Sequence, residues 1–173
     1  GAKHSLANAM MAVVNPGDEV IVPVPYWVSY VEQVKLAEGT NILVQTSIEN
    51  QFKLQPEQLR EAITDKTRAL ILCSPSNPTG SIYTREELRA LADVIRESKQ
   101  DIYIISDEIY EYINFEGQHQ SIAQFEDIRD QVIIINGVSK GFAMTGWRIG
   151  YIAAPLEIAK AYSKLQGQVT SGA

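Results

Sequence analysis

The sequence predicts an α/β protein of three layers, in which helices cover both faces of a mainly parallel, mixed sheet. Short apolar segments typical of strands alternate with amphipathic segments typical of helices along most of the chain. Strands separated by helices imply crossover connections, and such connections join parallel strands. A length of 173 residues with 45% hydrophobic residues allows one domain with a substantial buried core.

In the first half of the chain, apolar residues recur at helical spacing from Leu6 to Val13, and an Asn-Pro-Gly-Asp segment at 15–18 stops that helix. Gly39 ends the second helix, and Pro56 lies in the first turn of the third. The elements expected here are a helix at 3–14, a strand at 19–23, a helix at 27–38, a strand at 41–45 and a helix at 56–63.

In the second half, Thr84 and Glu87 have the spacing of a capping box at the start of a helix. The charged segment at 124–131 is expected to be a surface connection. The elements expected here are strands at 68–73, 102–105, 132–135 and 148–153, and helices at 84–97 and 156–166.

Composition excludes several classes of function. The 15 Lys and Arg residues against 21 Asp and Glu residues give a net charge of −6, which argues against nucleic acid or an anionic membrane as the main partner. No apolar segment approaches the length of a membrane span, and the N-terminus lacks a signal-peptide pattern. Cys73 is the single cysteine, so no internal disulfide can form, and we expect an inert thiol in a cytoplasmic protein. No His/Cys spacing indicates a metal site.

Polar clusters follow three of the expected strands, at 74–80, 106–110 and 136–140. Because open parallel sheets bind ligands beyond the carboxyl ends of their strands, these clusters are expected to share one rim. A lysine in such a setting can attack a carbonyl and form a Schiff base, and a nearby carboxylate can keep a ring nitrogen protonated. Taken singly, Lys140 would more often be a solvated loop residue, Asp107 a helix cap and Tyr110 a packing residue; their occurrence together favours the functional interpretation.

The motifs together resemble one family. They are Ser-Pro-Ser-Asn-Pro-Thr-Gly at 74–80, Ser-Asp-Glu-Ile-Tyr at 106–110, Ser-Lys-Gly-Phe-Ala-Met-Thr-Gly-Trp-Arg-Ile-Gly-Tyr at 139–151, Pro-Tyr-Trp-Val-Ser-Tyr at 25–30 and Gly-Ala-Lys-His-Ser-Leu at 1–6. In this order they resemble the fold-type I, class I/II pyridoxal-phosphate aminotransferases, and most of all the bacterial aspartate aminotransferase branch. The resemblance covers nearly the whole chain.

The resemblance implies three catalytic residues and the groups around the cofactor ring. Lys140 corresponds to the Schiff-base lysine that also shuttles a proton, and Asp107 to the partner of the pyridinium nitrogen. Asn77 and Tyr110 correspond to groups that hydrogen-bond the ring oxygen O3′, with Tyr110 counted among the catalytic residues. Trp27 corresponds to the aromatic residue stacked over the ring, and Trp27 and Asn77 are also expected to bind substrate. Glu108 is expected to be structural.

The resemblance also implies a site for the cofactor's phosphate group. Arg148 matches the family's phosphate-binding arginine, and Ala2 and Lys3 match the turn whose backbone amides meet the phosphate at a helix N-terminus. Ser139 precedes the lysine and is counted with them. Many relatives carry a phosphate-binding serine three residues before the lysine, but this chain has Gly137 there. Cis peptide bonds are implied at Val24-Pro25 and Asn77-Pro78.

The expected activity is transamination between an amino acid and a 2-oxo acid in a homodimer, with L-aspartate and 2-oxoglutarate favoured by resemblance. Aromatic amino acids, alanine and kynurenine remain alternative substrates. The chain begins directly before a helix and closes in a small polar segment at 167–173. We therefore expect 1–173 to be a truncated cofactor-binding large domain, without the family's N-terminal segment and small domain, and inactive in isolation.

Three other functions have partial support in the sequence. The acidic strand end at 104–108 resembles the Mg²⁺ site of nucleotide hydrolases, but the chain lacks the phosphate-binding G-x-x-x-x-G-K-[ST] motif. A hydrolase dyad of Ser139 and Lys140 is disfavoured because adjacent residues on a strand end point in different directions. A non-catalytic sensor module that binds pyridoxal phosphate is the remaining alternative.

Overall fold

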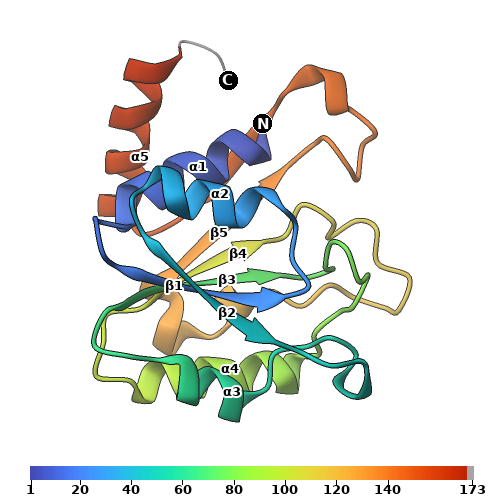
Figure 1. The fold of residues 1–173 in the computed structure, drawn as a ribbon. Helices are drawn as coiled ribbons and strands as arrows, with labels where there is room; N and C mark the ends of the chain where they lie inside the picture. The colour runs from blue at the N-terminus through green and yellow to red at the C-terminus, as the bar shows by residue number, and fades with distance from the viewer. Residues whose placement is uncertain (171–173) are drawn as a thin grey trace.

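A six-stranded sheet with helices on both faces forms the core of the computed structural model, which describes residues 1–170 (Figure 1). The strand order is β2-β1-β3-β4-β5-β6; the first five strands are parallel and β6 runs antiparallel to β5. The strands are β1 (Glu19–Val24), β2 (Thr40–Gln45), β3 (Thr67–Cys73), β4 (Tyr103–Asp107), β5 (Val132–Gly137) and β6 (Gly150–Ala153). The predicted three-layer α/β architecture is confirmed.

The helices divide between the two faces of the sheet. One face is covered by α1 (Ala2–Val13) and α2 (Ser29–Leu36), with α5 (Leu156–Val169) packed against α1, and the other by α3 (Pro56–Ala62) and α4 (Arg85–Glu97) (Figure 1). As predicted, Thr84 caps α4: its hydroxyl accepts a hydrogen bond from the Glu87 amide, and the Glu87 carboxylate accepts one from the Thr84 amide. Within residues 1–170, none of the helices combines the length and the apolar character needed to cross a membrane.

Each face of the sheet has its own hydrophobic core. Ile21, Leu70 and Ile104 pack towards α3 and α4, whereas Val20 and Ile105 pack towards α1 and α2. Successive strand residues therefore supply opposite cores, as a sheet covered on both sides requires. The central strands are fixed by packing on both faces, so the residues at their carboxyl ends are held in place.

Several predicted boundaries shift by a few residues. β4 extends to Asp107 and β5 to Gly137, so the first polar residues after the apolar segments are part of the sheet. α2 begins only at Ser29. β6 begins only at Gly150, because Arg148 has a left-handed backbone with φ of 56° and cannot be part of a strand. α5 continues through Val169, and residues 171–173 of the predicted closing segment lie outside the described residues.

The segment at 124–131 is more ordered than the predicted surface connection. It contains the end of a 3₁₀ turn, η2 (Ile122–Gln124), and a second turn, η3 (Glu126–Gln131). Ile128 and Phe125 are buried against the α4 side of the sheet, which explains why the charged segment folds onto the protein. The expected cis peptide bonds at Val24-Pro25 and Asn77-Pro78 are present, and Ser74-Pro75 is a third that the sequence did not indicate.

Two glycines allow β6 to pack closely between β5 and α1. Gly137 and Gly150 are paired across the two strands. A Cβ atom at Gly137 would lie 2.7 Å from the Ile149 carbonyl oxygen and 2.9 Å from the Gly150 Cα, and one at Gly150 would meet the backbone nitrogen of Ala2. A serine at position 137 would therefore displace backbone atoms, which gives a physical reason for glycine there.

Replacing Gly137 by alanine should lower the free energy of unfolding by about 1–3 kcal/mol, because the added methyl group has no space between the two strands. Urea unfolding measures this change. Gly167→Ala is the matched control: its Cβ would meet no atom within 4 Å, and in α5 it should stabilise the protein by up to about 1 kcal/mol. Equal stability of Gly137→Ala and the parent protein would contradict this account of the packing.

Candidate active site

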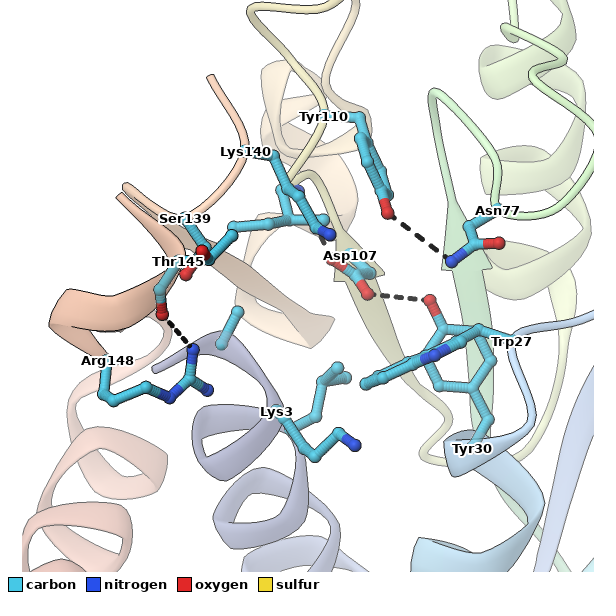
Figure 2. Close-up of a pocket in the computed structure, with 13 residues that line it drawn as sticks. Lys3, Trp27, Tyr30, Asn77, Asp107, Tyr110, Ser139, Lys140, Thr145 and Arg148 are labelled. Atoms are coloured by element: carbon cyan, nitrogen blue, oxygen red, sulfur yellow. Dashed lines mark hydrogen bonds between the residues drawn. The ribbon is translucent and has the colours of Figure 1, made fainter. Parts of the chain in front are cut away.

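A cavity of about 280 Å³ lies beyond the carboxyl ends of β3, β4 and β5 (Figure 2). Cross-strand pairing places Cys73 beside Asp107 and Asp107 beside Ile135, so the segments that leave these three strands start at the same level. The structure brings every predicted site residue to the wall of this cavity. These residues are Ala2, Lys3, Trp27, Asn77, Asp107, Tyr110, Ser139, Lys140 and Arg148.

Asp107 forms the floor of the site at the last position of β4, where it is only 3% exposed. Its Oδ2 accepts a hydrogen bond of 2.7 Å from the Tyr30 hydroxyl, and its Oδ1 accepts one of 3.2 Å from the Ile109 amide. Burial raises the pKa of Asp107 to about 6, although the two hydrogen bonds oppose that rise. At neutral pH the carboxylate is therefore ionised but close to its titration range.

The Lys140 side chain is exposed and points into the same cavity as the Asp107 carboxylate (Figure 2). Its Nζ lies 5.7 Å from the centroid of the Tyr110 ring. Across residues 1–170, no carboxylate forms an ion pair with this amine. An amine that is accessible and unpaired can react with a carbonyl group that enters the cavity.

Polar and aromatic groups complete the walls. The Asn77 side-chain amide donates a long hydrogen bond of 3.4 Å to the Tyr110 hydroxyl. The Trp27 ring meets the Tyr30 ring edge-on, with centroids 5.5 Å apart, and the Lys3 amine lies 4.9 Å from the Trp27 ring. A planar ring in this cavity would thus have an aromatic face beside it and hydrogen-bonding groups at its edge.

The end of the cavity opposite Asp107 has the composition of an anion site. The amides of Ala2 and Lys3 lie in the first turn of α1, where backbone N–H groups lack helical acceptors. The Arg148 guanidinium and the Ser139 hydroxyl line the same cavity, and Arg148 donates from Nη1 to the Thr145 carbonyl at 2.7 Å (Figure 2). This donor set fits a phosphate group, since backbone amides at a helix N-terminus and a guanidinium are both anion ligands.

Sequence reasoning missed Tyr30 and Thr145 as members of the site. Tyr30 falls within the quoted 25–30 motif, but only the fold shows that its hydroxyl reaches a residue 77 positions away. Thr145 contributes to the cavity wall through the short turn η4 (Thr145–Trp147).

Two neighbouring residues have the structural surroundings predicted for them. Burial raises the pKa of the Cys73 thiol to about 12, which keeps it protonated and unreactive. Glu108 is buried outside the cavity wall, where it accepts hydrogen bonds from Ser106 and Ser121 and contacts His119 at 2.9 Å. Its carboxylate faces away from the candidate site into this network.

Comparison with known proteins gives concordant results in sequence and structure. The family model for class I and II aminotransferases matches residues 1–173. The aspartate aminotransferase of Bacillus subtilis is 54% identical over 173 residues, which are 99% of this chain and 44% of that protein. The solved aspartate aminotransferase of Rhizobium meliloti superposes with a TM-score of 0.95 at 42% identity, covering 99% of this chain and 43% of that one.

A relative with a different named substrate class has almost the same fold. The solved aromatic aminotransferase of Pyrococcus horikoshii has a TM-score of 0.92 at 41% identity, over 98% of this chain and 45% of its own. The present chain thus spans less than half the length of the relatives it matches.

Replacing Asp107 by asparagine should stabilise the cofactor-free protein more at high pH than at low pH. Between about pH 3.8 and pH 6 the folded state binds more protons at this group than the unfolded state, so its contribution to stability falls as pH rises. Asparagine does not titrate, so the variant does not lose this contribution to stability as pH rises. The difference in unfolding free energy, variant minus parent, should therefore grow by up to about 3 kcal/mol between pH 4 and pH 7.

Urea unfolding across this pH range makes the measurement. Asp130→Asn, which removes an exposed carboxylate, serves as the control and should show no comparable growth. A pH-independent difference for Asp107→Asn would mean that the carboxylate does not titrate with a raised pKa.

Proposed function

The chain belongs to the class I and II aminotransferase family, and on that premise we propose that it forms the cofactor-binding large domain of a pyridoxal-phosphate-dependent transaminase. One observation carries the proposal: a reactive amine, a buried carboxylate and an anion site line a single cavity. Lys140 supplies the amine, Asp107 supplies the carboxylate, and the first turn of α1 together with Arg148 supplies the anion site. The three groups of pyridoxal phosphate with distinct chemistry are its aldehyde, its ring nitrogen and its phosphate, and each has a partner of fitting chemistry here.

When bound, pyridoxal phosphate supplies a cationic ring that accepts electrons from a substrate's α-carbon. Asp107 is the residue that would sustain this property. Its ionised carboxylate would accept a hydrogen bond from the protonated ring nitrogen, and its burial would strengthen that interaction. An ionised carboxylate is required, because a neutral acid gives no electrostatic preference for a cationic ring.

Lys140 would bind the cofactor covalently through Nζ and later act as acid and base. Its amine can take a proton from the substrate α-carbon and return one to the carbon that bore the cofactor's aldehyde. The exposed position of Lys140 suits both roles, since its amine forms no ion pair with any carboxylate of residues 1–170. The neighbouring Tyr110 and Asn77 would hydrogen-bond the ring's phenolic oxygen, and Trp27 would pack against the ring. Trp27 and Asn77 would also contact the substrate.

The proposed substrates are L-aspartate and 2-oxoglutarate, and the proposed assembly is a homodimer in the cytoplasm. The name of the Bacillus subtilis relative supports aspartate as the donor. The Pyrococcus horikoshii protein shows that the same large-domain fold also occurs in an aminotransferase named for aromatic substrates. Turnover of the full-length protein with aspartate, phenylalanine, alanine and kynurenine, each with 2-oxoglutarate, separates these alternatives.

Lys140→Ala should abolish covalent attachment of the cofactor while leaving the fold intact, because the other lysine on the cavity wall, Lys3, lies against the Trp27 ring, where we assign no contact with the aldehyde. The test is reduction with borohydride followed by peptide mass mapping, with transamination measured in parallel in the full-length protein. Lys160→Ala, which removes an exposed lysine on α5, is the control and should retain the adduct. An adduct in Lys140→Ala at another lysine would remove the proposed role.

Arg148→Ala should weaken binding of pyridoxal phosphate about tenfold, the loss expected for a solvent-exposed contact between a guanidinium and a phosphate. Pyridoxal, which lacks the phosphate, should bind the parent and the variant equally. Equilibrium dialysis with both ligands tests this, and Arg60→Ala controls for the loss of an exposed arginine outside the cavity. A similar loss of affinity for pyridoxal would show that Arg148 does not act through the phosphate.

A further inference from the structure

The hydroxyl of Tyr30 is buried against the one carboxylate of the proposed cofactor site. Tyr30, on α2, is 3% exposed and lies beside Asp107, and its hydroxyl donates a 2.7 Å hydrogen bond to Asp107 Oδ2 (Figure 2). The other oxygen, Oδ1, accepts the Ile109 amide. Both carboxylate oxygens thus have a donor, and Tyr30 supplies the only one from a side chain among residues 1–170.

The direction of this hydrogen bond makes it sensitive to the charge of Asp107. A hydroxyl that donates to a carboxylate stabilises the ionised form and opposes the cost of burial. Burial and the nearby Asp107 charge raise the pKa of Tyr30 well above its ordinary value, so the tyrosine keeps its proton and remains the donor. Loss of the hydroxyl would therefore raise the pKa of Asp107 further, because one of the two hydrogen bonds that counteract the effect of burial would be missing.

The other titratable groups near Asp107 do not replace this donor. The Cys73 thiol on β3 lies beside both residues but stays protonated, and the charge of Glu108 raises the pKa of Asp107 further. Lys140 and Tyr110 face the same cavity, and no hydrogen bond joins either of them to Asp107 in the described part of the chain.

We propose that Tyr30 is a positioning residue that holds the Asp107 carboxylate ionised and fixed in orientation for the nitrogen of a bound pyridine ring. The consequence for the cofactor ring rests on the proposed function. The effect of Tyr30 on the protonation of Asp107 does not, because it can be measured in the protein without cofactor. Tyr30 would not touch the reacting atoms. It would act through Asp107 by keeping both the charge and the direction of that side chain.

A purely structural role for Tyr30 is the alternative, because its ring packs in the core beneath α1 and edge-on against Trp27. Tyr83 provides a matched comparison. It is 4% exposed, and its hydroxyl accepts a 2.7 Å hydrogen bond from the Leu54 amide, outside the cavity. Tyr30→Phe and Tyr83→Phe each remove one buried hydroxyl and keep the ring, so a general loss of stability would be shared by both variants.

The first test follows the protonation of Asp107 in the cofactor-free, full-length protein. Carboxyl-¹³C aspartate labelling identifies the Asp107 signal by its absence in Asp107→Asn. In the parent protein and in Tyr83→Phe the signal should titrate near pH 6. In Tyr30→Phe it should titrate near pH 7 or above, by the typical strength of a hydrogen bond to a charged group. An unchanged titration in Tyr30→Phe would overturn the inference.

A second variant keeps the inference testable should Tyr30→Phe fold poorly. 3-Fluorotyrosine at position 30 keeps the ring and the hydroxyl but makes the hydroxyl a stronger donor. The Asp107 signal should then titrate at a lower pH than in the parent protein. A shift in the opposite direction, or none, would contradict the proposed donation.

The final test uses the holoenzyme and reads the cofactor directly. With ¹⁵N-labelled pyridoxal phosphate, the ring nitrogen should lose its proton at a lower pH in Tyr30→Phe than in the parent and in Tyr83→Phe. In an Asp107→Asn background, Tyr30→Phe should cause no further change in cofactor affinity, because its partner is already neutral. A parent protein that binds no pyridoxal phosphate would overturn the proposed function. The titration of Asp107 without cofactor would still decide the role of Tyr30.

Discussion

The site depends on one constraint: a carboxylate must stay ionised although its side chain is almost completely buried. In the part of the chain that the structure describes, Asp107 satisfies this constraint through its position and its hydrogen bonds, and it forms no ion pair. It ends β4 in the middle of the sheet, with β3 and β5 on either side, and its two oxygens accept from Tyr30 and Ile109. An arginine or lysine beside it would lower its pKa more strongly, but would also compensate the charge that a cationic ligand needs.

Sheet topology explains why the remaining groups converge on this carboxylate. β3, β4 and β5 are adjacent and parallel, so the chain leaves all three at one rim and carries Asn77, Tyr110 and Lys140 to the same cavity. The crossover helices pack on the faces and leave this rim open. Two well-packed cores hold the strand ends in place, so the geometry of the site is a consequence of stability elsewhere in the sheet.

The sequence was informative wherever the controlling interaction is local or periodic. The capping box joins Thr84 to Glu87, only three residues further along the chain. The apolar strands predict a sheet that is buried on both faces, and this pattern was sufficient to predict the fold class. The antiparallel direction of β6 and the need for Gly137 depend on contacts with distant backbone, which no local pattern encodes. The role of Tyr30 could not be predicted for the same reason. An aromatic residue on a helix indicates packing, and only the folded chain shows that its hydroxyl lies beside Asp107.

The two ends of the cavity differ in their exposure to solvent, and charges at each end therefore interact with a ligand with different strength. The Asp107 end is buried, so its interactions act at low dielectric and are sensitive to a single hydrogen bond. The anion site lies where the first turn of α1 meets Arg148, which is exposed. Charges there are screened by water and salt, so they favour reversible capture of an anion over control of its chemistry. A ligand spanning both ends would be retained by its anionic group and activated at its ring, with the Lys140 amine in the same cavity.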